Sequence, residues 1–168
     1  MKNETMLYEE LVRSMYDSGS HEMVSNGKPE HAIVLFKLFF EQAKSRVAIF
    51  CRDLNASVFG DDRILNAAKE AVTRGVSVQV ITQSDNPEPT NFREWLETTA
   101  KTNNQIFIRH CDSGNRFEKL EANFAIMDER AFRLESDRTK IAAFAWLNNP
   151  KDAAQFGRIF DSIRVALA

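Results

Sequence analysis

Cysteine is scarce in this sequence of 168 residues, which contains only Cys51 and Cys111. The two residues form no Cys-x-x-Cys pair and no cluster at the spacing of metal ligands, and each stands at or just after the end of an expected strand. This usage is typical of reduced thiols in a cytoplasmic protein.

Long apolar runs and runs of like charge are also missing. No apolar stretch approaches the roughly 18 residues that a membrane span needs, so no membrane association is expected. The first ten residues, MKNETMLYEE, are acidic where a signal peptide would be basic and then apolar, which again favours a cytoplasmic location. A formal net charge of -2 leaves no basic footprint for nucleic acid across the whole chain, although a local patch is left open.

Phenylalanine, by contrast, is abundant. The sequence has thirteen, and they recur inside apolar segments. This distribution favours a phenylalanine-rich core or dimer interface over platforms that stack on bases. With 43% apolar and 27% charged residues, the chain has the composition of one globular domain.

The N-terminal segment reads as a separate element. Residues 4–17 are expected to form a helix whose apolar stripe contains Leu7, Leu11 and Met15, with Met6 and Val12 beside it. Gly19, Gly27 and Pro29 mark the segment that follows as a loop or linker. We therefore divide the chain into an N-terminal helix and linker at 1–28 and a main domain at 29–168.

The main domain alternates helical and strand patterns. Helices are expected at 30–44, 61–75, 90–102 and from Pro150 onward, and strands at 46–51, 76–82, 105–109 and 141–147, with a hairpin at 120–136. The run RVAIFC at 46–51 is apolar without alternation, as in a strand that is buried on both faces. A strand, a helix, a glycine and a strand make a βαβ unit, so its strands should be parallel. The fold class is therefore α/β, a mixed sheet flanked by helices with an extra N-terminal helix.

The hairpin at 120–136 (LEANFAIMDERAFRLES) carries the most specific pattern. In its spacing it resembles the active-site hairpin of the phospholipase D superfamily, H-x-K-x4-D-x6-G-S. Asp128 and Ser136 occupy the aspartate and serine positions, whereas Glu121 replaces the histidine, Asn123 the lysine and Glu135 the glycine. The order of elements from residue 29 onward is also similar to that of the single-domain nuclease-like branch, in which two chains form one active site.

The resemblance implies a phospholipase D-like domain that has lost its chemistry. The family attacks a phosphodiester with a histidine and holds the phosphate oxygens with lysine. Glu121 would repel an anionic substrate, and Asn123 offers a dipole in place of a positive charge. The first hypothesis is therefore a catalytically inactive homodimer that serves as a binding, sensing or assembly module, with a protein partner left open and a bacterial defence-type system as one setting.

Two other functions are kept as alternatives. The first is a phosphodiesterase or nuclease with a displaced site, using His110 or a metal held by acidic residues of the hairpin. The second is a sensor of nucleotide ligands that uses Arg52, Arg109 and His110 at the strand ends, where open α/β sheets bind ligands.

Each candidate residue also has a structural interpretation. Asp128 fits a hairpin turn, where aspartate is common. Arg133 and Glu135 should face one side of their strand and form an ion pair. The acidic residues Glu121, Asp128, Glu135 and Asp137 fit a solvated strand edge better than a metal site, so no metal ion and no cofactor are predicted.

Overall fold

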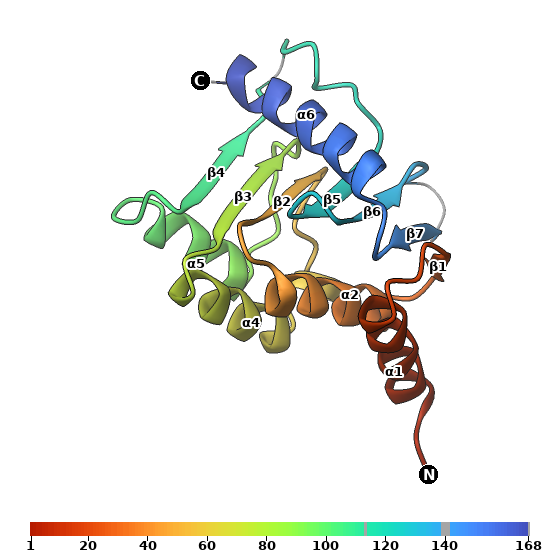
Figure 1. Ribbon diagram of the computed structural model, residues 1–168. Helices are drawn as coiled ribbons and strands as arrows, with labels where there is room; N and C mark the ends of the chain where they lie inside the picture. The colour runs from red at the N-terminus through yellow and green to blue at the C-terminus, as the bar shows by residue number, and fades with distance from the viewer. Residues whose placement is uncertain (113, 139–141, 168) are drawn as a thin grey trace.

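The computed structural model of the chain describes residues 1–112, 114–138 and 142–167, and within them a mixed sheet lies between two layers of helices (Figure 1). The helices are α1 (Glu4–Asp17), α2 (Pro29–Gln42), α3 (Ala56–Phe59), α4 (Asp62–Thr73), α5 (Asn91–Thr99) and α6 (Pro150–Ala166). The strands are β1 (Met23–Asn26), β2 (Arg46–Cys51), β3 (Ser77–Thr82), β4 (Ile106–His110), β5 (Asn123–Met127), β6 (Ala131–Glu135) and β7 (Ala143–Trp146).

The seven strands form one sheet in the order β1-β7-β6-β5-β2-β3-β4. Strand β2 pairs in parallel with β3, and β3 in parallel with β4, which confirms the predicted βαβ unit. The remaining neighbours are antiparallel, including the hairpin of β5 and β6. The fold class predicted from the sequence, a mixed sheet flanked by helices, is thus confirmed.

Strand β2 separates two apolar cores, as its unbroken apolar run predicts. Val47 and Ile49 face a core shared with α1, α2, α4 and α5. Ala48 and Phe50 face a second core, which α6 covers with Phe160. Figure 1 shows α2, α4 and α5 on one side of the sheet and α6 on the other.

The phenylalanines build these cores, as expected. Nine of the thirteen are buried and the other four are half-buried, so none stands free on the surface as a stacking platform. On the α2 side, Phe92 of α5 contacts the rings of Phe59 and Phe40 at centroid distances of 5.3 and 6.1 Å. Aromatic rings bury large apolar areas, so this cluster contributes much of the free energy that joins α5 to α2.

Helix ends follow signals that the sequence contains. Thr90 caps α5 by accepting a hydrogen bond from the Arg93 amide at 3.1 Å. Gly75 ends the α4 region with a positive φ of 95°, a conformation that favours glycine. The short α3 was not predicted, and Asn55 caps it through its side chain.

The segment between α1 and α2 was expected to be a loop, and this prediction is wrong. Strand β1 is formed by Met23–Asn26 and pairs antiparallel with β7 at one edge of the sheet. The expected strand at 141–147 is observed as β7, and Ile141 lies outside the described residues. The division into 1–28 and 29–168 stays a prediction.

Helix α1 buries a face that overlaps the predicted apolar stripe at Val12 and Met15 but not at Leu7 and Leu11. Tyr8, Val12 and Tyr16 are buried, whereas Leu7 and Leu11 are about half exposed, at 54% and 49%. The tyrosines are buried in preference to the leucines because a tyrosine makes polar contacts in addition to burying its apolar ring. The Tyr8 hydroxyl donates to the Ser25 carbonyl at 3.1 Å, and the Tyr8 ring stacks on His31 at 3.9 Å.

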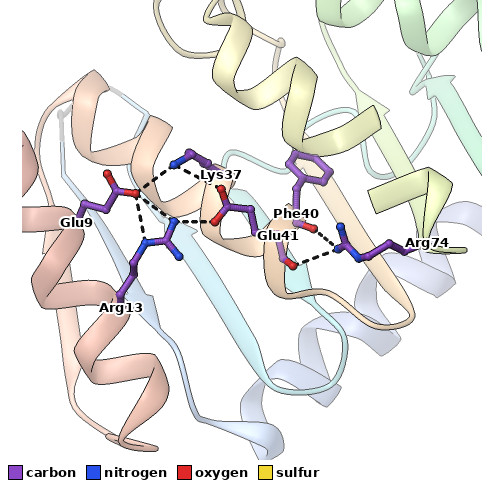
Figure 2. Close-up of polar contacts among 6 residues, drawn as sticks. All are labelled: Glu9, Arg13, Lys37, Phe40, Glu41 and Arg74. Carbon is purple, nitrogen blue, oxygen red and sulfur yellow. Dashed lines mark hydrogen bonds and ion pairs between the residues drawn. The ribbon is translucent and has the colours of Figure 1, made fainter. Parts of the chain in front are cut away.

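Polar contacts join α1 and α4 to the two sides of α2 (Figure 2). Arg13 of α1 pairs with Glu41 of α2 at 2.6 Å, and Glu9 pairs with Arg13 and with Lys37 of α2. At the end of α2, the Arg74 guanidinium donates to the Phe40 carbonyl at 2.7 Å and to the next carbonyl at 3.1 Å. These bonds satisfy acceptors that a helix end leaves without partners.

Candidate functional site at the carboxyl end of the sheet

The parallel strands β2, β3 and β4 all end on the same side of the sheet, here called the carboxyl end. Because β5 is antiparallel to β2, it begins there, and Asn123 stands beside Arg52, the residue that follows β2. Register also places Asn123 opposite Glu135, the last residue of β6. The topology thus brings Asn123 and Glu135, two positions of the resembled signature, to the place where α/β sheets bind ligands.

Asn123, at the position of the family's lysine, is held by two hydrogen bonds. Its Oδ1 accepts from the Arg52 amide at 2.9 Å, and its Nδ2 donates to the Glu135 carboxylate at 3.1 Å. The side chain therefore connects the end of β2 with the end of β6. A side chain engaged in this way supports the geometry of the site instead of reaching toward a substrate.

Glu121, at the histidine position, precedes β5 and is exposed. It lines an open pocket of about 440 Å³ together with Arg52 and Arg138. Arg138 donates to the Ala122 carbonyl at 2.9 Å and to Gln83 of the neighbouring loop. Burial lowers the pKa of Arg138, so its positive charge is partly desolvated beside this pocket. Ser136 follows β6 and is exposed.

Arg133 and Glu135 face the same side of β6, as predicted, with 3.9 Å between guanidinium nitrogen and carboxylate oxygen. Arg133 also donates from Nε to Asn26 Oδ1 at 3.1 Å and lies over the Phe36 ring. Burial lowers the pKa of Arg133, and the Glu135 carboxylate opposes this shift. Asn26 was missed in the sequence because its strand has only four residues and pairs far along the chain.

Asp128 lies at the other end of the sheet, separated from Asn123 by the whole of β5, about 16 Å at the usual rise of a strand. Its carboxylate accepts hydrogen bonds from the amides of Lys44, Ser45 and Arg46 at 3.0, 2.8 and 3.0 Å and from the Ser45 hydroxyl at 2.9 Å. Its backbone has a φ of 53°, a left-handed conformation that aspartate tolerates. Asp128 therefore acts in the turn, apart from the carboxyl end.

His110 and Arg109 end β4, three strands away from Asn123, or about 14 Å at the usual strand spacing. His110 Nε2 lies 3.0 Å from the Asp85 carboxylate, and both line a pocket that does not include Arg52. Arg109 donates to the Ile108 carbonyl and lies over the Phe107 ring. The three residues proposed to bind one ligand, Arg52, Arg109 and His110, are thus split between separate places.

The side chains give little support for a metal site or for a reactive cysteine. Because Asp128 is remote, the four acidic residues of the hairpin region do not converge, and the described residues contain no group of three or more potential ligands placed to hold a metal ion. Cys51 and Cys111 are free cysteines, and both are buried. Burial raises the pKa of Cys51 to about 12, which keeps it a neutral thiol and a poor nucleophile.

No helix within residues 1–112, 114–138 and 142–167 has the length and apolar character required to span a membrane.

Comparison with solved structures relates this architecture to the phospholipase D-like fold. NucT from Helicobacter pylori superposes with a TM-score of 0.60 at 14% identity, covering 86% of this chain and 98% of that one. Nuc from Salmonella typhimurium, a phospholipase D family member, gives a TM-score of 0.58 at 19% identity, covering 86% of this chain and 96% of that one. The resemblance inferred from the hairpin is thereby confirmed at the level of the fold.

TrmBL2, an archaeal chromatin protein with a novel mode of DNA binding, matches with a TM-score of 0.58 at 14% identity. The match covers 93% of this chain, which spans 58% of the length of TrmBL2. A comparison with curated proteins finds no match. The profile of the domain of unknown function DUF7931 matches residues 28–163. The chain has the phospholipase D-like fold and belongs to the DUF7931 family.

Proposed function

We propose that this chain is a non-catalytic phospholipase D-like domain that works as a binding module through the carboxyl end of its sheet. The proposal rests on the side chains found at the family's histidine and lysine positions. Glu121 is exposed and acidic, and the Asn123 side chain is used in hydrogen bonds to Arg52 and Glu135.

The three histidines of the chain offer no replacement for the nucleophile. His31 is stacked on Tyr8, and His21 lies 2.7 Å from the Asn148 carbonyl. His110 remains at the carboxyl end, but it lies beside Asp85, three strands away from Asn123. Covalent phosphodiester chemistry needs a nucleophile aligned with the groups that hold the phosphate. TrmBL2, a DNA-binding protein, is an example of a binding protein with a similar fold.

The proposal predicts that the pure protein cleaves no phosphodiester. It is incubated with supercoiled DNA, with RNA and with bis(p-nitrophenyl) phosphate, each with and without magnesium. The expected rate equals that of buffer. Cleavage that is lost in Glu121→Ala or in His110→Ala, and kept in the control Glu129→Ala at the opposite end of the sheet, would overturn the proposal in favour of a displaced active site.

Homodimerisation is the second part of the proposal, and it follows from the family resemblance. Light scattering is expected to give twice the chain mass of 19.2 kDa. A double variant, Leu7→Lys with Leu11→Lys, tests whether the dimer forms through α1, because these half-exposed residues form an apolar stripe there. A dimer that persists in the variant supports contact through the hairpins. A wild-type mass of one chain at high concentration would exclude the shared site. The setting in a bacterial defence-type system stays a prediction of the resemblance.

A further inference from the structure

A second cavity, of about 200 Å³, lies beside Glu135 on the face of the sheet that carries α2. Its lining includes Asn26 at the end of β1, Lys28 at the start of α2, Ser57 of α3, and Arg133 and Glu135 of β6. A smaller cavity next to it shares the walls formed by Arg133 and Glu135. The volume suits a small ligand of a few heavy atoms and excludes a folded nucleic acid.

Arg133 presents hydrogen-bond donors to this cavity without acceptors to receive them. Its side chain is 12% exposed, and among the described residues its only hydrogen bond runs from Nε to Asn26. Within the described part of the chain, the carboxylate paired with these terminal nitrogens is that of Glu135, at 3.9 Å, which is beyond hydrogen-bond distance. A desolvated guanidinium in this state is costly, and an anion that accepts from it would remove the cost.

Asn26 supplies a second donor without a partner. The residue is 3% exposed, and its Oδ1 is identified by the hydrogen bond that it accepts from Arg133. Its Nδ2 is consequently the other amide atom, and it has no hydrogen-bond partner among the described residues. Native proteins leave few buried polar groups unpaired, so an orphan amide that lines a cavity points to a missing acceptor.

The other charged groups around the cavity, Lys28 and Glu135, each have a hydrogen-bond partner. Glu4 neutralises Lys28 at 2.6 Å, and the Glu135 carboxylate accepts from Asn123. Helix α2, with 14 residues, begins at this wall, and its N-cap residue Lys28 makes no side-chain capping bond. The positive end of the helix dipole thus adds to the field of Arg133.

From these features we infer that the cavity between α2, β1 and β6 binds a small anion, a carboxylate or a phosphate, through Arg133 and Asn26. The inference rests on the proposed function, since it names the ligand class of a binding module. Two unpaired donors require an acceptor with at least two oxygens, which both anions supply. A metal cation would be repelled by the same groups.

The test is calorimetric titration of the full chain with sodium phosphate, sodium acetate and adenosine monophosphate, at matched ionic strength in sodium chloride. Stoichiometric binding of at least one probe is expected, and the arms separate free phosphate, carboxylate and nucleotide. Arg133→Met should weaken that binding at least tenfold, because it removes a charge-assisted donor. The matched control Arg158→Met, at an exposed arginine of α6 on the opposite face of the sheet, should leave it unchanged.

Asn26→Asp keeps the acceptor for Arg133 and replaces the orphan donor by a negative charge. It should raise the unfolding midpoint of the free protein while weakening anion binding at least tenfold, two changes that a purely structural asparagine would not combine. The inference is overturned if none of the three probes binds at about 10 mM, a concentration far above a useful dissociation constant. It is also overturned if Arg133→Met leaves the affinity unchanged. Phosphodiester cleavage with intact anion binding would instead overturn only the proposed function.

Discussion

Replacing Asp128 with alanine is expected to lower the free energy of unfolding by about 3 kcal/mol, since hydrogen bonds to a charged group are the stronger ones and an alanine in the left-handed conformation is strained. The carboxylate accepts from three consecutive amides, those of Lys44, Ser45 and Arg46, where α2 passes into β2. Removing it leaves these donors without partners. Urea unfolding monitored by circular dichroism measures the loss.

Two variants serve as controls for this result. Asp128→Asn keeps one acceptor and tolerates the φ of 53°, so its loss should be smaller, about 1 kcal/mol. Glu129→Ala changes the exposed neighbour in the same turn and should have little effect. If Asp128→Ala is no less stable than Glu129→Ala, the hydrogen bonds described here do not stabilise the fold.

The same carboxylate makes stability depend on acidity. Burial raises the pKa of Asp128, but the hydrogen bonds from Arg46, Lys44 and Ser45 outweigh burial and hold the pKa below its usual value. Because the folded state has the lower pKa, the contribution of Asp128 is complete above the unfolded pKa of about 3.9 and is lost as the pH falls through the folded value. Unfolding midpoints measured from pH 6 down to pH 2 should show this loss in the wild type and lack it in Asp128→Asn.

Phe92→Ala is expected to have the larger effect on stability, about 4 kcal/mol, as for other phenylalanines deleted from a packed core. The ring is fully buried at 0% exposure and touches Phe40, Phe59 and Trp95. The cavity that alanine leaves cannot collapse easily, because its walls are themselves rigid rings on α2, α3 and α5.

Phe144→Ala is the matched control for this cluster, since Phe144 is only half-buried on β7. Its loss should be less than half of that of Phe92→Ala in the same urea titration. Equal losses for the two variants would mean that the cluster around Phe92 has no special weight and that burial of any phenylalanine is equivalent.

Elements with strong local signals could be predicted from the sequence. The apolar run at 46–51 and the β-branched run at 76–82 became β2 and β3, and Pro150 begins α6 as expected. Burial on both faces of β2 makes such runs distinctive, since a half-buried strand would show alternation. The hairpin was also found, because its turn and its spacing are encoded within 17 residues.

Elements that depend on distant partners were missed or misread. Strand β1 is held by β7, more than 100 residues later, and four residues give too short a pattern to detect. On α1, hydropathy favours Leu7 and Leu11, whereas the fold buries Tyr8 and Tyr16 through ring stacking and hydrogen bonds. Such contacts are decided by the tertiary structure and leave no local trace.

The candidate site shows the same division. Alternation along β6 correctly paired Arg133 with Glu135, a contact between near neighbours. The sequence could not place Asn26 against Arg133, which lies 107 positions away. Nor could the sequence predict that His110 and Arg52 lie apart, because the distance between two strand ends depends on the order of strands in the sheet.

The turn of the hairpin has a consequence for folding cooperativity. While Asp128 holds the start of β2, Arg130 reaches α1: it donates to the Tyr16 hydroxyl and carbonyl at 2.9 and 3.0 Å and lies 3.8 Å over the Tyr16 ring. It also binds Asn148, whose amide donates to the Met15 carbonyl. A single turn thus contacts the first helix, strand β2 and the segment that leads into the last helix. Local unfolding of α1 would break bonds made by the hairpin turn, so we expect α1 to unfold together with the rest of the domain.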